Sequence, residues 1–237
     1  MPKVRLTLSA NAGVSLEIGG YKVLVDTYHE AAESGFSALS PVLAQRVLNS
    51  DRFLDPDCIC YTHCHGDHYS RRLTALAREH WPKAKLLLPE AEFADQITVS
   101  GNRFSWRKGD LVLRFIKLPH EGAQYAGVKH YGLIVSIPGF RVLLSGDCAV
   151  AAPELADAVG DTHIDLAVMD FPWASLKKGK QFLETVIRPG HLLLYHLPFA
   201  EDDLNGYREA AALAQNKSPV ADTRLLWNPL QTEIYEW

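Results

Sequence analysis

The chain has 237 residues, of which 47% are hydrophobic and 22% charged, a composition typical of globular proteins that excludes disorder as the main state. Its length predicts one single domain over residues 1–237 that folds without disulfides. Lys and Arg number 24 and Asp and Glu 28, so the net charge is 24 − 28 = −4. The chain therefore has no excess of positive charge that would predict binding to nucleic acid.

Apolar runs and cysteines bear on the compartment. No apolar run approaches the roughly 20 residues that a membrane helix needs, and the first residues carry no signal-peptide core. Three of the four cysteines crowd beside histidines instead of spreading as a disulfide framework does; the four are Cys58, Cys60, Cys64 and Cys148. We expect a reduced, cytoplasmic protein with no membrane partner.

The N-terminal part predicts strands interrupted by helices. Apolar and polar residues alternate in the first strands, and Gly19-Gly20 is typical of a two-residue hairpin turn. Ser40 before Pro41 predicts a capped helix start. The expected strands are 4–8, 14–18, 21–25, 58–61 and 85–88, and the expected helices are 41–48, 71–80 and an acidic helix over 90–96.

The rest of the chain predicts a run of strands and then an alternation of helices and strands. The expected strands are 103–106, 111–117, 131–137, 141–144, 165–169 and 192–195, with short strands near residues 225 and 234. The expected helices are 153–159, 181–187 and 202–215. Hairpins early and strand–helix alternation late predict an α/β layer architecture.

The segment Thr62-His63-Cys64-His65-Gly66-Asp67-His68 follows a predicted strand and concentrates side chains that bind metals. Imidazoles and carboxylates suit Zn²⁺, Fe and Mn. His63 and His65 share one face of an extended turn. We expect the backbone to bend freely at Gly66 and so turn Asp67 and His68 toward a second position. One short loop can then serve two adjacent ions.

Three more candidate ligands each follow a predicted strand. They are His120, Asp147 and His196. Catalytic groups of α/β proteins gather outside the carboxyl ends of strands, so these three can converge with the first cluster.

The whole set, in this order along the chain, resembles the metallo-β-lactamase superfamily. The segment Asn11-Ala12-Gly13-Val14, with residues 20–26, is also similar to the opening hairpins of that family. The resemblance implies a four-layer αβ/βα sandwich of the metallo-β-lactamase type, with a dinuclear site at a sheet edge. It implies that His63, His65 and His120 hold one ion, that Asp67, His68 and His196 hold the other, and that Asp147 bridges them. Zn²⁺ is the expected metal, with Fe and Mn as alternatives.

The expected chemistry follows from two metals about 3.5–4 Å apart, which can share a hydroxide and polarise a carbonyl or phosphoryl oxygen. Solvent is then the nucleophile, and Asp67 is the expected catalytic residue that orients it or accepts its proton. We expect a lactonase-like, metal-dependent hydrolase acting on a small-molecule ester, lactone, thioester or phosphoester.

Three alternatives stay open. The first is a phosphodiesterase or nuclease, against which the acidic net charge argues. The second is a non-hydrolytic di-iron redox module, in whose relatives the second position of the motif tends to be an acid where this chain has His65. The third is a non-catalytic scaffold, which would tend to lose ligands.

Residues outside the motif receive weaker predictions. The segment 171–180 combines aromatics with lysines, so Lys177, Lys178 and Lys180 predict a loop for an anionic substrate. Tyr195 is a further substrate-binding candidate. His130 is an alternative ligand to His120. Asp26 either orients a ligand imidazole or stabilises a turn, His29 is expected in solvent, Cys64 is expected to turn away from the metals, and a role for Cys148 is left open.

Overall fold

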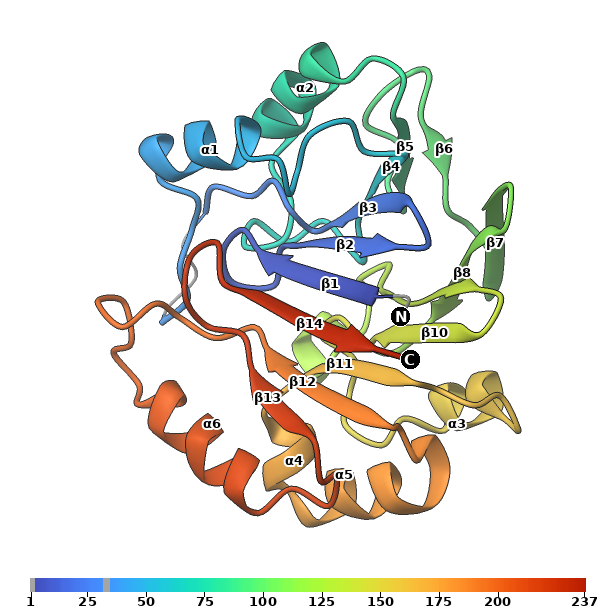
Figure 1. Ribbon diagram of the computed structural model, residues 1–237, viewed down its shortest axis with the longest axis vertical. Coiled ribbons are helices and arrows are strands. Elements are labelled where there is room, and N and C mark those ends of the chain that lie inside the picture. The colour runs from blue at the N-terminus through green and yellow to red at the C-terminus, as the bar shows by residue number, and fades with distance from the viewer. Residues whose placement is uncertain (1–2, 32–34) are drawn as a thin grey trace. The chain divides into compact units, whose positions relative to one another are not determined.

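The computed structural model describes residues 3–31 and 35–237 (Figure 1). They form two compact units: unit 1 comprises residues 3–31, 35–99, 196–205 and 226–237, and unit 2 comprises residues 100–195 and 206–225. Each unit contains one seven-stranded sheet. Because both units are assembled from separate stretches of sequence, neither can be excised as one continuous segment.

The sheet of unit 1 combines antiparallel hairpins with parallel strands, in the order β14-β1-β2-β3-β4-β5-β6. Its strands are β1 (Lys3–Leu8), β2 (Val14–Ile18), β3 (Tyr21–Val25), β4 (Cys58–Cys60), β5 (Lys85–Leu88), β6 (Ile97–Thr98) and β14 (Thr232–Glu236). The predicted Gly19-Gly20 hairpin turn is confirmed, and both glycines have positive φ. β3 and β4 are parallel with Val25 opposite Cys60, so the loops after these two strands start side by side.

The two helices of unit 1, α1 (Pro41–Leu48) and α2 (Arg71–His80), have the predicted bounds because their start signals are local. The Ser40 hydroxyl accepts a hydrogen bond from the Leu43 N–H at 3.2 Å. The Ser70 hydroxyl caps α2 in the same way, accepting from the Leu73 N–H at 3.1 Å. Ser70 thus ends the histidine-rich loop and begins α2.

The predicted acidic helix over residues 90–96 is wrong. The Gln96 side chain accepts hydrogen bonds from the backbone N–H groups of Glu92 at 2.9 Å and Phe93 at 2.8 Å. It also donates to the Glu90 carbonyl at 2.5 Å. One side chain thus supplies the partners that a helix would supply from its backbone, and the segment stays a loop leading into β6.

The sheet of unit 2 has the order β13-β12-β11-β10-β9-β8-β7. Its strands are β7 (Arg103–Lys108), β8 (Leu111–Lys117), β9 (Tyr131–Ile137), β10 (Phe140–Leu144), β11 (Leu166–Asp170), β12 (His191–Tyr195) and β13 (Thr223–Leu225). β7 to β10 form an antiparallel meander, and β10 to β13 are parallel. The carboxyl ends of β10, β11 and β12 therefore lie at one edge of this sheet.

The helices of unit 2 depart most from the predictions. They are η1 (Ala123–Tyr125), α3 (Pro153–Val159), α4 (Pro172–Ser175), α5 (Lys177–Phe182), the π-helical η2 (Leu183–Ile187) and α6 (Tyr207–Asn216). The expected substrate loop over 171–180 is largely helical, because Gly179 lets α5 pack closely on the Trp173 backbone. The helix expected from residue 202 begins only after Gly206, whose φ is 71°.

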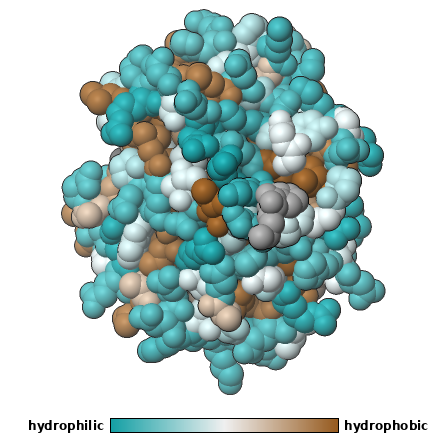
Figure 2. Space-filling view, in the orientation of Figure 1, coloured by the Kyte–Doolittle hydropathy of each residue, from teal (hydrophilic) through white to brown (hydrophobic). Residues whose placement is uncertain are grey.

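Hydrophobic side chains fill both units, and polar ones dominate the face in Figure 2, where hydrophobic residues form only small groups. Among the residues that the structure describes, no helix is long and apolar enough to cross a membrane.

Gly13 stands where the turn between β1 and β2 passes close to the segment after β3. A Cβ at this position would lie 2.7 Å from the Asp26 carbonyl oxygen and 3.0 Å from the Thr27 Cα. We therefore expect Gly13→Ala to lower the free energy of unfolding by about 1–3 kcal/mol, measured by urea denaturation. Gly127→Ala is the control, because nothing lies within 4 Å of a Cβ there. Equal midpoints for the two variants would contradict the close approach.

Candidate metal centre

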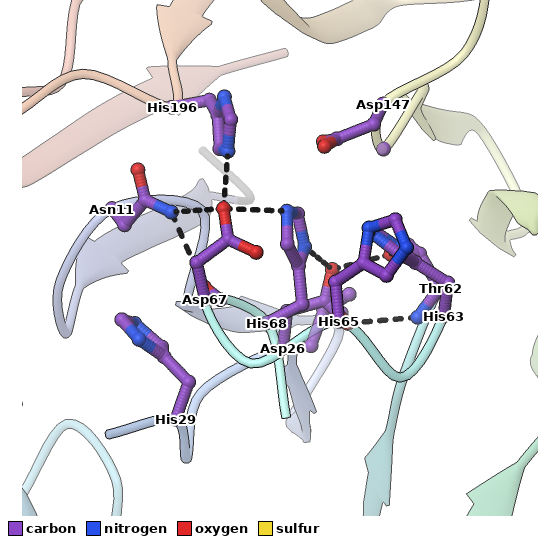
Figure 3. A network of polar contacts seen from close by, with 12 residues as sticks. Asn11, Asp26, His29, Thr62, His63, His65, Asp67, His68, Asp147 and His196 are labelled. Carbon is purple, nitrogen blue, oxygen red and sulfur yellow. Dashed lines mark hydrogen bonds and ion pairs between the residues drawn. The ribbon is translucent and has the colours of Figure 1, made fainter. Parts of the chain in front are cut away.

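The candidate ligands of unit 1 come from two loops (Figure 3). His63, His65, Asp67 and His68 lie between β4 and α2, and His196 directly follows β12. The N–H groups of His68 and Tyr69 donate to the His65 carbonyl at 3.0 and 2.8 Å, which closes the loop into a turn. The chain turns at Gly66, Asp67 and His68, where the sequence predicted a bend, although Gly66 is not among the glycines with positive φ. The bend is an ordinary hydrogen-bonded turn.

This turn brings the polar atoms of its side chains together. His63 Nε2 lies 3.1 Å from His65 Nδ1. Asp67 Oδ2 lies 3.8 Å from His68 Nε2 and 3.5 Å from His196 Nε2. The rings of His63 and His68 are 4.1 Å apart between centroids. The five candidate side chains of unit 1 thus form one cluster, in which His63, Asp67, His68 and His196 are buried.

The spacing and chemistry of this cluster fit a divalent ion. Ligand atoms bonded to a tetrahedral zinc ion at about 2.0–2.1 Å lie about 3.3 Å from one another. The distances of 3.1, 3.5 and 3.8 Å between neighbouring nitrogen and oxygen atoms bracket that value. Ligand atoms of Asp67, His68 and His196 all lie within 4.8 Å of one another. Imidazoles with one carboxylate form a donor set for zinc, iron or manganese.

Asp26 orients two of the imidazoles through their Nδ1 atoms, directly at His68 and through Thr62 at His63. Its carboxylate is fully buried and accepts hydrogen bonds from the Thr62 N–H at 2.7 Å and the Thr62 hydroxyl at 2.6 Å. It also lies 3.0 Å from His68 Nδ1, so Nδ1 donates to Asp26 and Nε2 is the nitrogen near Asp67. The Thr62 hydroxyl gives its hydrogen to Asp26 and so accepts from His63 Nδ1 at 3.0 Å. Of the two alternatives for Asp26, the structure supports the orienting one.

The sequence predicted that His29 lies in solvent, and this prediction is wrong, because His29 is fully buried. Its Nε2 donates to the Ala10 carbonyl at 3.1 Å. Burial lowers the pKa of His29 from 6.5 to about 4, and this carbonyl offsets part of that effect. His29 therefore stays neutral near neutral pH and acts as a support for the turn between β1 and β2.

Unit 2 holds the other two candidate ligands. His120 Nε2 lies 3.5 Å from Asp147 Oδ2, and the Glu121 N–H donates to the Asp147 carbonyl at 2.8 Å. A bridge between His120 and Cys148 joins the same two loops. The alternative, His130, is buried with its Nδ1 3.2 Å from the Leu118 carbonyl. Within unit 2 it is therefore His120 that pairs with the carboxylate of Asp147.

The cysteines have structural surroundings. Cys58 and Cys60 are buried in β4. Burial raises the pKa of the Cys64 thiol to about 12, and the backbone of Glu90 offsets part of that effect. The Cys148 thiol donates to the Ala149 carbonyl at 3.3 Å, and burial raises its pKa.

The predicted substrate-binding residues lie in different surroundings. Tyr195 is buried at the end of β12, whereas Lys177 and Lys178 are exposed on α5. Lys180, on the same helix, is partly exposed. Their roles toward a substrate stay predictions.

Comparisons with known proteins bear on the fold. Neither a scan against protein-family models nor a search of curated proteins gives a match. Among solved structures, the chain is similar to Igni18, a metallo hydrolase from Ignicoccus hospitalis, with 17% identity, a TM-score of 0.66 and 99% of both chains covered. It is also similar to the metallo-β-lactamase fold protein YhfI from Bacillus subtilis, with 12% identity, a TM-score of 0.61 and 100% of both chains covered.

The chain has the metallo-β-lactamase fold. The α/β sandwich that the sequence predicted is thereby confirmed. A third similar structure is CmlA, a diiron β-hydroxylase from Streptomyces venezuelae, with 14% identity and a TM-score of 0.64. The match covers 100% of this chain but 55% of CmlA. The solved structures similar to this chain thus include both a metallo hydrolase and a diiron β-hydroxylase.

The buried His29 predicts a loss of stability in acid. Its pKa is lowered in the folded state, so between pH 6.5 and about 4 the unfolded chain binds a proton that the folded chain does not. Stability is therefore present above pH 6.5 and is lost as the pH falls toward 4. We expect metal-free wild type to lose about 2 kcal/mol more than His29→Gln between about pH 7 and about pH 5, because Gln keeps a donor but does not titrate. Urea denaturation measures the difference, and superimposable pH profiles would exclude this role.

Proposed function

We propose that this protein is a metal-dependent hydrolase of a small-molecule ester, lactone, thioester or phosphoester. The observation that carries the proposal is the approach of Asp67 Oδ2 to His68 Nε2 and His196 Nε2, with Asp26 holding the far side of His68. Metal sites in enzymes are typically built in this way, from imidazole and carboxylate ligands whose outer atoms are hydrogen-bonded to further residues.

We further propose that the centre takes two divalent ions, with Zn²⁺ as the expected metal. Within unit 1, His63 and His65 would contribute to one ion, and Asp67, His68 and His196 to the other. His120 and Asp147 of unit 2 complete the ligand set that the sequence predicts. When bound, the ions supply a nucleophilic hydroxide at neutral pH and polarise the bond that is attacked.

The residues of the chain have separate roles in this proposal. Asp67 orients the attacking water and accepts its proton, because its Oδ2 lies among the imidazole nitrogens. Asp26 and Thr62 fix the orientations of His68 and His63 through Nδ1, which reserves Nε2 of each ring for the centre. No serine or cysteine nucleophile is required, in agreement with the structural surroundings of Cys64 and Cys148.

A di-iron redox function is the second candidate, because CmlA has this fold. The presence of His65 at the second position of the motif argues for hydrolysis. The net charge of −4 argues against a nuclease. We propose a small substrate, with Lys177 and Lys178 as the cationic groups available to an anionic one. The two units, each assembled from separated stretches, support the proposal of one domain over residues 1–237.

We expect purified protein to bind close to two Zn²⁺ ions per chain, since the predicted ligands exceed what one tetrahedral ion can use. His120→Ala should lower this stoichiometry and nearly abolish turnover, whereas His130→Ala should leave the metal content unchanged. Elemental analysis after equilibrium dialysis measures the metal content of the wild type and of both variants, and a hydrolysis assay measures turnover. Saturation of the wild type at one ion would exclude a dinuclear centre. Loss of metal in His130→Ala but not in His120→Ala would make His130 the ligand in place of His120.

The hydrolase itself is tested with a panel of lactone, thioester and phosphodiester substrates. We expect turnover of one class, its loss on treatment with a chelator and its return when Zn²⁺, Fe²⁺ or Mn²⁺ is added. Asp67→Asn should lower kcat by about 100-fold or more, because the amide cannot accept the proton. An absence of hydrolysis together with reversible reduction of bound iron would favour the redox function instead.

A further inference from the structure

Asn11 contacts the proposed catalytic residue from a turn that the motif does not include. It lies between β1 and β2, is fully buried and has a φ of 49°. Its Nδ2 donates to the Asp67 carbonyl at 3.2 Å and approaches Asp67 Oδ2 at 3.4 Å (Figure 3). One amide therefore contacts both the backbone and the carboxylate of the same residue, which restricts the rotamers of Asp67.

The turn that carries Asn11 is fixed at several points. The Gly13 N–H donates to the Ala10 carbonyl at 2.7 Å, and the Ser9 N–H donates to the Gly13 carbonyl at 2.8 Å. His29 Nε2 donates to the Ala10 carbonyl as well, and the Ser9 hydroxyl donates to the Thr27 carbonyl at 3.1 Å. Asn11 is thus held at the tip of a rigid turn, in a left-handed conformation that asparagine tolerates better than most residues.

The donor end of Asn11 accounts for its placement. Asn11 Oδ1 is buried and has no hydrogen-bond partner among the residues that the structure describes. A buried acceptor without a partner lowers the stability of the folded state, so the oxygen of this amide does not explain why an asparagine stands here. The contacts of Nδ2 with Asp67 are what the side chain contributes.

The contacted oxygen is the one in the cluster. Asp67 Oδ2, near Asn11 Nδ2, is also the atom 3.5 Å from His196 Nε2 and 3.8 Å from His68 Nε2. A neutral amide donor can orient this carboxylate without adding a charge that would compete with a cation. His63 and His65 form the other pair of the cluster, with His63 Nε2 3.1 Å from His65 Nδ1.

We propose that Asn11 is a positioning residue that sets the carboxylate of Asp67 and thereby the affinity of the ion position formed by Asp67, His68 and His196. The inference rests on the proposed function, since it presupposes a metal centre. It assigns Asn11 an effect on one ion position and not on the position to which His63 and His65 contribute.

The test is titration of metal-free protein with Zn²⁺, followed by calorimetry, for wild type, Asn11→Gly and Asn11→Asp. Glycine adopts the left-handed conformation and lacks the amide, whereas aspartate keeps the shape and Oδ1 but has no N–H to donate. Asp55→Gly is the matched control, because Asp55 is an exposed residue of unit 1 with a φ of 50°.

We expect Asn11→Gly to weaken one of the two Zn²⁺ binding events by about 10–100-fold and the other by less than about twofold, with a urea midpoint equal to that of Asp55→Gly. Asn11→Asp should bind the same ion more weakly than wild type does, and in both variants kcat should fall more than KM rises.

Three outcomes overturn the inference. Equal weakening of both binding events together with a lower urea midpoint would make Asn11 a structural residue only. Full affinity in Asn11→Asp would show that the N–H donor is not what matters. Two unchanged binding events in Asn11→Gly would exclude any role in metal affinity while leaving the proposed function intact. Wild type that binds no Zn²⁺, Fe²⁺ or Mn²⁺ would instead overturn the proposed function itself.

Discussion

The candidate centre depends on the hydrogen bonds that the buried carboxylate of Asp26 accepts. The parallel register of β3 and β4 places Val25 opposite Cys60, so the residues that follow the two strands can contact one another. Asp26 uses this proximity to accept both the N–H and the hydroxyl of Thr62 and to hold His68. Removing a buried carboxylate that has several donors would leave those donors without partners, which is costly. Sheet register and imidazole orientation are therefore linked through one side chain.

The backbone around the centre is held in conformations that are otherwise unfavourable. Asn11, Asp26 and His196 all have positive φ, at 49°, 49° and 55°. Such conformations cost about 1–3 kcal/mol each and persist only where the surroundings determine them. Here hydrogen bonds from Asn11 to Asp67 and from Thr62 and His68 to Asp26 supply that determination. His196 belongs to the cluster, and Asn11 and Asp26 contact its members Asp67 and His68, so the strained backbone lies where side chains must be placed precisely.

Local signals explain which features could be predicted from the sequence. Ser40 with Pro41, Ser70, and Gly19-Gly20 act on neighbours within a few residues, so both helices and the hairpin of unit 1 have the expected bounds. The helix over 90–96 failed because the side chain of Gln96 replaced backbone partners, which residue propensities do not reveal. His29 and Asn11 were missed or misplaced because their partners lie far away in sequence: Asn11 contacts a residue 56 positions later. The Asn-Ala-Gly turn next to a buried strand was the only signal available for Asn11.

Asp67, in the cluster, and Asp26, beside it, differ in the lengths of their contacts, and this difference separates their roles. The contacts of Asp26 with Thr62 and His68 range from 2.6 to 3.0 Å, which are ordinary hydrogen bonds. Asp67 Oδ2 lies 3.5 Å from His196 Nε2 and 3.8 Å from His68 Nε2, too far for strong hydrogen bonds. These distances match instead the separation of atoms that share a cation. The same residue type thus serves as a fixed support at one position and as a ligand candidate at the other, and the distinction comes from the donors that the fold places around each.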